Sequence, residues 1–248
     1  MLAVIGGSGL SALDNLEIAR RAPVRTPYGE PSSALAFGSI RGREVVFLPR
    51  HGERHAVPPH AVNYRANLWA LHAVGVRNVM AVASVGGIGA RLSPGTLVVP
   101  HQILDYTHGR EATFVTGSDG RLLHVDFTAP YCGELRERIL AAAVKTGHCA
   151  VDGATYAATQ GPRLETAAEI DRLERDGADI VGMTGMPEAA LARELELCYA
   201  ALAIVVNPAA GRGEDAHRVR LEDIPVILQE AKGKVLAIIE ELVTTDGD

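Results

Sequence analysis

The chain of 248 residues is 47% hydrophobic and 22% charged, values that are ordinary for a folded domain and exclude a disordered one. Its net charge of -6 disfavours nucleic-acid binding, so any anionic ligand needs a local cluster of hydrogen-bond donors. The longest apolar run, at 199–206, is far too short to span a membrane.

In the first half of the chain, apolar runs that end in glycine or proline predict strands. We expect these at 2–5, 34–40, 44–48, 78–83 and 96–99. Residues 63–74 have helical apolar spacing, and Gly75 follows them as a C-terminal cap. Residues 107–123 mix glycine, threonine, serine and charge without periodicity. They predict a long mobile loop, of the kind that serves as a lid or an interface arm.

In the second half, helices and strands alternate with short connections. Helices are expected at 134–146, 166–176, 187–196 and 221–243, and strands at 153–159, 179–181 and 199–206. This alternation predicts an α/β fold with one domain over residues 1–248, in which a mixed, mostly parallel central sheet is flanked by helices. In such sheets, ligands bind beyond the carboxyl ends of the strands. The loops at Gly6, Arg50, Ser84, Thr184 and Asn207 are therefore expected to converge on one pocket.

The three cysteines, Cys132, Cys149 and Cys198, are scattered and form no CxxC pair. We therefore expect neither a disulfide framework nor a thiolate zinc site, and the composition favours a reducing compartment. The N-terminal residues lack the positive region of a signal peptide. A cytoplasmic location is the prediction.

Gly6 to Gly9 follow the first predicted strand and surround Ser8, so their backbone amides and a hydroxyl are suited to bind an anion. The spacing Gly7-x-Gly9-x-x-Ala12 also fits a dinucleotide fingerprint. That fingerprint needs an acidic residue about 20 positions later at the end of a second strand, where this chain has a turn at 26–31. An ordinary glycine turn remains an alternative.

Arg50 and His51 directly follow another apolar strand. The guanidinium fork suits phosphate oxygens, and the imidazole adds a further donor. His51, His55 and His60 raise the alternative of a metal site. Their spacing fits no compact zinc pattern and no carboxylate or thiolate accompanies them, so no metal is expected.

Other candidate residues have ordinary alternatives. Met183 and Thr184 are predicted to lie under a sugar and on a phosphate, although a core methionine gives the same pattern. Asn207 ends the most apolar strand, where it either caps a turn or bonds a ligand. Glu165 either complements a helix dipole or accepts from a ligand N–H.

Six stretches in the same order span nearly the whole chain and resemble the trimeric purine nucleoside phosphorylase and methylthioadenosine phosphorylase family. They are Ile5-Gly-Gly-Ser-Gly-Leu10, Arg50-His51-Gly52, Val62-Asn-Tyr-Arg-Ala-Asn67, Ala83-Ser-Val-Gly-Gly87, Gln160-Gly-Pro-Arg-Leu-Glu-Thr166 and Gly182-Met-Thr-Gly-Met-Pro-Glu188. The resemblance implies a nucleoside phosphorylase fold and a homotrimer. It also implies inorganic phosphate as co-substrate, with no metal or organic cofactor.

The same resemblance assigns roles. Phosphate would be held by Ser8, Arg50, His51, Ser84 and Thr184; the ribose by Met183; and the base by Leu164, Glu165 and Asn207, while His124 would reach a neighbouring subunit's pocket. Arg50, His51 and Asn207 would carry catalysis, as phosphate attacks the anomeric carbon and Asn207 stabilises the departing purine.

Three departures from the family bear on the substrate. The methylthioadenosine enzymes carry aspartate at the positions of Asn207 and Ala209, and serine at that of Glu165. An amide and a glutamate there favour a 6-oxopurine, which has a ring N–H and a carbonyl. Leu221 aligns with the histidine that inosine enzymes place near the 5′-hydroxyl, and an apolar residue suits a methylthio group.

Together these residues predict phosphorolysis of methylthioinosine to hypoxanthine and 5-methylthioribose 1-phosphate. Alternatives are the same reaction on methylthioadenosine or on inosine and guanosine. From a different class, an NAD-binding oxidoreductase or a nucleotide-binding module is suggested by the glycine loop alone.

Overall fold

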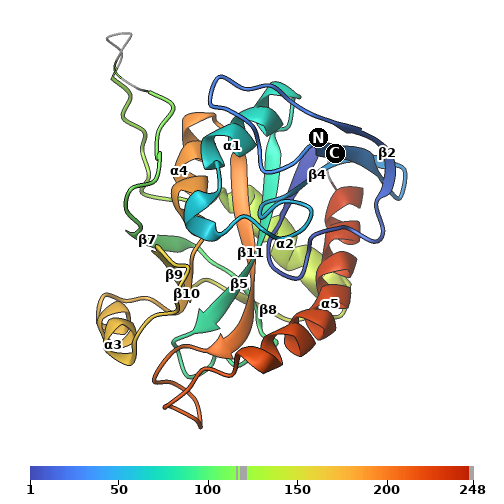
Figure 1. Ribbon diagram of the computed structural model, residues 1–248. Coiled ribbons are helices and arrows are strands. Elements are labelled where there is room, and N and C mark those ends of the chain that lie inside the picture. The colour runs from blue at the N-terminus through green and yellow to red at the C-terminus, as the bar shows by residue number, and fades with distance from the viewer. Residues whose placement is uncertain (116, 118–121, 246–248) are drawn as a thin grey trace.

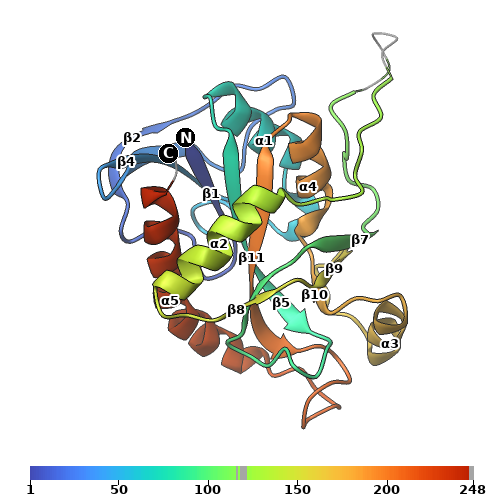
Figure 2. The same ribbon diagram turned by 180° about the vertical axis from the view of Figure 1, so that it is seen from behind.

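An eleven-stranded mixed sheet forms the centre of the protein in the computed structural model, which describes residues 1–115, 117 and 122–245. Helices α1 (Tyr64–Ala73) and α4 (Gly185–Glu194) cover one face of the sheet. Helices α2 (Gly133–Lys145) and α5 (Ile224–Thr244) cover the opposite face, which Figure 2 shows in front. Helix α3 (Ala167–Arg175) lies at the side, beside β9 and β10 (Figure 1). The predicted α/β architecture is confirmed.

The strands have the following bounds: β1 (Leu2–Gly6), β2 (Glu17–Ala22), β3 (Leu35–Ile40), β4 (Arg43–Pro49), β5 (Asn78–Gly87), β6 (Leu97–Val99), β7 (Gln102–Tyr106), β8 (Ala150–Asp152), β9 (Thr155–Thr159), β10 (Ile180–Gly182) and β11 (Cys198–Pro208). Short 3-10 helices η1 (Pro59–Ala61) and η2 (Leu221–Asp223) complete the elements. The predicted helices agree with these bounds within three residues. The predicted strands at 78–83 and 199–206 are longer in the structure than expected.

Strict alternation of side chains along the central strands divides the core into two layers. In β5, Val79 and Ala81 pack with α1 and α4, whereas Met80 and Val82 pack with α2 and α5. Because successive residues of a strand point to opposite faces, a strand buried on both faces is apolar throughout. This explains why β1, β5 and β11 were predictable as strands from their composition.

Strands β2, β7 and β8 were missed by the sequence analysis. Strand β2 is the polar segment EIARRA, exposed along nearly its whole length at the edge of the sheet. Strands β7 and β8 are only partly buried. Such strands lack the apolar signal that marks a central strand, so their pairing is set by tertiary contacts.

Strand β5 pairs along one edge with β11, in parallel, over its full length. Its other edge pairs with two different strands. β1 runs parallel to it as far as Ile5 opposite Ala81, and β10 runs antiparallel to it at Gly86 and Gly87. The ends of β1 and β10 therefore approach each other along β5 and leave Val82 to Val85 between them.

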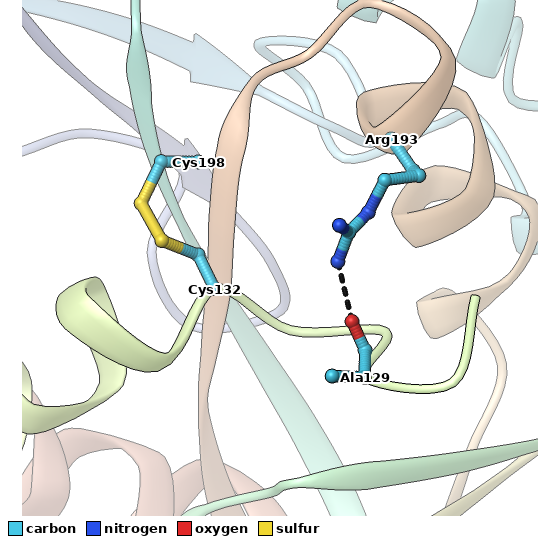
Figure 3. The surroundings of a disulfide bond; sticks show 4 residues. All are labelled: Ala129, Cys132, Arg193 and Cys198. Carbon is cyan, nitrogen blue, oxygen red and sulfur yellow. Dashed lines mark hydrogen bonds between the residues drawn. A yellow bond between two sulfur atoms is a disulfide. The ribbon is translucent and has the colours of Figure 1, made fainter. Parts of the chain in front are cut away.

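A disulfide bond joins Cys132 to Cys198, contrary to the expectation of no disulfide (Figure 3). The two cysteines are 66 positions apart, so no local motif marks the pair. They meet because the residues before α2 lie beside the start of β11, where the Cys132 amide donates to the Tyr199 carbonyl at 2.8 Å. Arg193 of α4 also binds the same segment, because its side chain donates a hydrogen bond to the Ala129 carbonyl (Figure 3). Cys149 is free and exposed.

Residues 107–115 and 122–127 contain no helix or strand, in agreement with the predicted loop, whose positions 116 and 118–121 lie outside the described residues. The first part of this loop packs against the body of the protein rather than standing free. The Phe114 ring contacts that of Tyr28, and its amide donates to Glu194 at 2.8 Å. Within the described part of the chain, no helix is long and apolar enough to cross a membrane.

Candidate active site

A cavity of about 380 Å³ opens where the ends of β1 and β10 meet along β5. Strands β1, β4, β5 and β11 are mutually parallel, so their carboxyl ends lie at this same edge. Strand β10 enters from the other direction because it is antiparallel to β5. The predicted convergence of the five loops is confirmed, since Gly7, Arg50, Ser84, Thr184 and Asn207 all line the cavity.

Most of the residues predicted for the site line this single cavity. These are Ser8, Arg50, His51, Ser84, Leu164, Glu165, Met183, Thr184 and Asn207. The cavity also takes in His55, Val219 and Ile224, which the sequence analysis did not assign to it.

Arg50 lines the cavity and is almost completely buried, with 1% of its surface exposed. Its Nε and Nη2 donate to the two carboxylate oxygens of Glu188 at 2.7 and 2.9 Å, and its Nη1 donates to the Val82 carbonyl at 3.0 Å. Burial alone would lower the pKa of Arg50, but the Glu188 carboxylate more than offsets this and keeps the pKa above its ordinary value. The guanidinium is therefore a permanent cation, with two N–H bonds left for a ligand.

Glu188 is fully buried and also accepts a hydrogen bond of 2.8 Å from the Tyr199 hydroxyl. Burial, together with the Glu188 carboxylate, raises the pKa of Tyr199 well above its usual range, so this hydroxyl remains a donor. Sequence reasoning missed Glu188 as a site residue. The available signal was a carboxylate followed by the apolar run Ala-Ala-Leu, because a buried charge needs a partner.

His51 is buried and uncharged near neutral pH. Burial, with a contribution from the Arg50 charge, lowers the pKa of His51 to about 4. Its Nδ1 lies 2.8 Å from the Val57 carbonyl, which can only accept, so Nδ1 carries the proton. In the neutral ring, Nε2 is then an acceptor, and not the additional donor that the sequence analysis assigned to it. His51 is therefore suited to accept a hydrogen bond from a hydroxyl group of a ligand.

The glycine loop after β1 lies directly against this arrangement. A Cβ on Gly7 would sit 2.5 Å from the Val82 carbonyl oxygen and 3.0 Å from Arg50 Nη1, so only glycine fits there. The next residue, Ser8, places its hydroxyl 3.3 Å from Nε2 of His55. The His55 ring packs against that of His51 with centroids 4.7 Å apart. Ser8 and the guanidinium of Arg50 thus place hydrogen-bond donors in one cavity, which makes this end a candidate anion site.

The other end of the cavity contains an amide and a carboxylate. Strand β11 has a bulge between Val205 and Asn207, after which Asn207 pairs with Gly86. Such bulges re-aim side chains next to active sites. Asn207 Nδ2 donates to the Pro208 carbonyl at 2.6 Å, which leaves the second N–H and the oxygen of the amide to bind a ligand.

Glu165 is oriented by Thr159, whose hydroxyl donates to its Oε1 at 2.6 Å. A carboxylate held in this way keeps its other oxygen as an acceptor for an N–H group of a ligand. Thr159 was also missed by the sequence analysis, because a threonine at the end of a strand carries no functional signal of its own. Thr166 caps α3 and Glu169 completes the capping box, so the helix dipole does not need Glu165.

Two predicted site residues do not line the cavity. Leu221 lies in η2 and is 57% exposed, whereas Val219 and Ile224, on either side of it in sequence, line the cavity; its contact with the 5′ group of a substrate stays a prediction. The segment between β11 and η2 contains no helix or strand, so spacing in the sequence does not fix which of its residues face the cavity. His124 is exposed and does not line the cavity of its own chain, so its contact with a neighbouring subunit stays a prediction.

No group of three or more His, Cys, Asp or Glu side chains in the described ranges is arranged to hold a metal ion. His51 and His55 are engaged with Val57 and Ser8, as described above. The expectation of no metal and no organic cofactor stays a prediction.

Comparisons with known proteins find relatives that match nearly the whole chain. The family model of the phosphorylase superfamily matches residues 1–244. A protein of Pseudomonas syringae named probable S-methyl-5′-thioinosine phosphorylase is 51% identical over 242 residues, which cover 98% of each chain. The 6-oxopurine nucleoside phosphorylase of Pyrococcus furiosus is 42% identical, over 93% of this chain and 94% of that protein.

Among solved structures, methylthioadenosine phosphorylase from Schistosoma mansoni in complex with adenine has a TM-score of 0.93 and 32% identity to this chain. The match covers 99% of this chain and 91% of that one.

Proposed function

The chain belongs to the phosphorylase superfamily and is a pentosyltransferase of the purine nucleoside phosphorylase type, and we propose that it cleaves S-methyl-5′-thioinosine with inorganic phosphate. The products are hypoxanthine and 5-methylthioribose 1-phosphate. The observation that carries this proposal is a single cavity lined by a buried guanidinium, Arg50, and by an amide and a carboxylate, Asn207 and Glu165.

Strand β5 sets the distance between the two ends. Arg50 is bonded to Val82 and Asn207 pairs with Gly86, four residues further along the strand. At the rise of a β-strand this separation is about 13 Å, which accommodates a phosphate, a pentose and a purine in a row.

Phosphate is the nucleophile, and Arg50, Ser8 and Thr184 hold it beside the anomeric carbon. As the glycosidic bond lengthens, positive charge develops on the sugar and negative charge on the purine. The bound phosphate anion stabilises the sugar cation as well as attacking it. His51, whose Nε2 accepts, favours a phosphate or ribose hydroxyl that points its hydrogen toward the ring.

The leaving purine is stabilised by Asn207, which donates to its ring nitrogen or carbonyl oxygen. Glu165 accepts the ring N–H that hypoxanthine has and adenine lacks. The hydrogen bond from Thr159 supports this role because it fixes the carboxylate in one orientation. This pair favours a 6-oxopurine over adenine.

An apolar wall supports the methylthio group. Val219 and Ile224 line the cavity, and Leu228, one turn of α5 beyond Ile224, would contact a Cβ on Gly9 at 3.0 Å. These residues therefore lie near the loop that holds Ser8. A thioether buries well against such side chains, whereas a 5′-hydroxyl there lacks a partner. Phosphorolysis of inosine and guanosine is the alternative, because the P. furiosus relative is named a 6-oxopurine nucleoside phosphorylase.

The test is an assay of purified protein with phosphate and each of four nucleosides: methylthioinosine, methylthioadenosine, inosine and adenosine. We expect phosphate-dependent release of hypoxanthine from methylthioinosine at the highest kcat/KM. A higher kcat/KM for inosine favours the alternative, and adenine release from methylthioadenosine as the main reaction contradicts the base assignment. Titration with NAD in the same buffer, with binding observed, would instead support a nucleotide-binding module.

The assembly we propose is a homotrimer located in the cytoplasm, in which His124 completes a neighbour's site near the 5′ group. Residues 107–115 and 122–127 lie at the side of the body in Figure 1, and their exposed side chains, His124 among them, support a contact with another copy. Light scattering after size exclusion tests the trimer, and a monomer that is fully active contradicts the role of His124.

A further inference from the structure

Arg110, in the segment that follows β7, bonds the backbone at the ends of two neighbouring strands. Its Nη1 donates to the carbonyls of Met183 and Met186, after β10, at 2.8 and 2.6 Å. Its Nη2 donates to the carbonyls of Thr159 and Gln160, at the end of β9, at 3.2 and 2.8 Å. One planar guanidinium thus bridges both strand ends.

Three further contacts fix the orientation of Arg110. Its Nε donates to Gln160 Oε1 at 3.1 Å, and the same oxygen accepts from the His108 amide. Nη1 also lies 3.3 Å from the Tyr64 hydroxyl, with the guanidinium carbon 5.5 Å from the centre of that ring. Among the described residues, no carboxylate forms an ion pair with Arg110, so its partners are neutral acceptors. Arg110 therefore fixes the positions of these groups through directed hydrogen bonds and does not neutralise a negative charge.

The backbone that Arg110 holds carries side chains from both ends of the cavity. Thr159, whose carbonyl it binds, orients Glu165 through a hydroxyl bond of 2.6 Å. Met183, whose carbonyl it also binds, lines the cavity next to Thr184. The two segments also contact each other directly at Gly161, which lies so close to Met183 that a Cβ there would be 2.4 Å from the Met183 sulfur.

The backbone is irregular at one of these four carbonyls. Met186 has non-helical angles (φ -119°, ψ 140°) inside α4, so the regular hydrogen-bond pattern of the helix is interrupted there. Buried carbonyl groups without partners cost free energy, and a planar fork of donors satisfies several of them at once. A lysine, with a single ammonium group, does not span both strand ends in this way.

We propose that Arg110 is a positioning residue of the active site, which sets the ends of β9 and β10 so that Glu165 and Met183 face one substrate. The expected changes in rate and substrate preference rest on the proposed function, whereas the expected change in hydrogen exchange does not. Without Arg110 the end of β9 is no longer fixed, so Thr159 orients Glu165 less well and selectivity for the 6-oxopurine falls together with the rate.

The experiment compares Arg110→Met and Arg110→Lys with Arg136→Met. Arg136 is the control because it also donates to two successive strand-end carbonyls, those of Pro100 and Val99, but neither of these residues lines the cavity. Unlike Arg110, it also forms an ion pair with Asp152. The measurements are kcat/KM for methylthioinosine and methylthioadenosine, thermal unfolding, and hydrogen exchange of the native full-length protein.

For Arg110→Met we expect about a 100-fold loss of kcat/KM with methylthioinosine, the size that a misplacement of about 1 Å produces. The preference over methylthioadenosine should shrink, and exchange should accelerate at 159–165 and 183–187. Arg110→Lys should show the same changes to a smaller degree, and Arg136→Met should keep the preference even where it unfolds more readily. A purely structural role lowers stability without changing the preference.

The proposal is overturned if Arg110→Met keeps rate and preference within about threefold of wild type, or if Arg110→Lys restores both completely. If wild-type protein does not cleave methylthioinosine, the proposed function fails, and hydrogen exchange still decides. In that case, faster exchange at both segments in Arg110→Met supports the positioning role, and unchanged exchange removes it.

Discussion

Replacement of Glu188 by glutamine tests the buried ion pair on which the anion site is built. The change conserves shape and removes the negative charge from a carboxylate that accepts three hydrogen bonds, two from Arg50 and one from Tyr199. In glutamine, an NH2 group replaces one of the two carboxylate oxygens, so a donor then faces an N–H group of Arg50. Arg50, 1% exposed, then keeps its charge without a counter-charge.

The expected cost follows from the burial of both partners. Breaking a fully buried pair by removing one charge costs about 3–5 kcal/mol, whereas an exposed pair costs less than about 1 kcal/mol. For a chain of this size, each kcal/mol lowers Tm by about 2–4 °C, so Glu188→Gln should lower Tm by about 6–20 °C. The guanidinium also loses the contact that orients it, so the KM for phosphate should rise.

Urea unfolding, thermal unfolding and phosphate saturation curves measure these effects. The matched control is Glu196→Gln, the same chemical change at an exposed residue just after α4, which should change stability by less than about 0.5 kcal/mol. If Glu188→Gln is as stable as this control and binds phosphate normally, the buried pair does not organise the site.

Three further predictions concern the two ends of the cavity. Asn207→Asp replaces the donor toward the purine carbonyl, so kcat/KM for methylthioinosine relative to methylthioadenosine should fall by about 5- to 100-fold, corresponding to about 1–3 kcal/mol for a lost pairing; an unchanged ratio counts against the base assignment. Gly7→Ala should displace Arg50 from Val82 and raise the phosphate KM by about tenfold or more, as overpacking costs about 1–3 kcal/mol. Gly133→Ala, which adds a Cβ with nothing within 4 Å, is its control, and equal KM values for the two variants would refute the close approach. For His51, the pKa lowered to about 4 means that the unfolded chain takes up a proton near pH 6.5 while the folded protein resists it. The free energy of unfolding should therefore fall as the pH drops from 6.5 to 4, by about 3 kcal/mol from this group, and His51→Gln should reduce the slope in urea titrations; parallel slopes in the two proteins would show that His51 is not buried in the neutral form.

The central strands and the loops after them were predictable because their signals are local. Strands β1, β5 and β11 are apolar on both faces, and glycine or a polar residue marks where each strand reaches the cavity. The convergence of Gly7, Arg50 and Asn207 follows from the parallel pairing of β1, β4, β5 and β11. Thr184 lines the cavity as predicted, but for a different reason, because β10 runs antiparallel to β5 and no local sequence pattern indicates that direction.

Residues that act through others were beyond the reach of sequence reasoning. Glu188, Thr159 and Arg110 become visible only when chain segments far apart in sequence are brought together. Arg50 and Glu188, for instance, are 138 positions apart. The same holds for the disulfide between Cys132 and Cys198 and for the apolar wall. In the latter, the irregular segment after Asn207 determines that Val219 and Ile224, rather than Leu221, face inward.

The most direct test of the account is a crystal structure of the protein with methylthioinosine and sulfate, the latter standing in for phosphate. We expect sulfate on the guanidinium of Arg50 and the hydroxyl of Ser8, hypoxanthine between Glu165 and Asn207, and the anomeric carbon between the two. The methylthio group should contact Val219 and Ile224. Sulfate and purine in separate cavities, or a purine whose ring N–H points away from Glu165, would contradict the account.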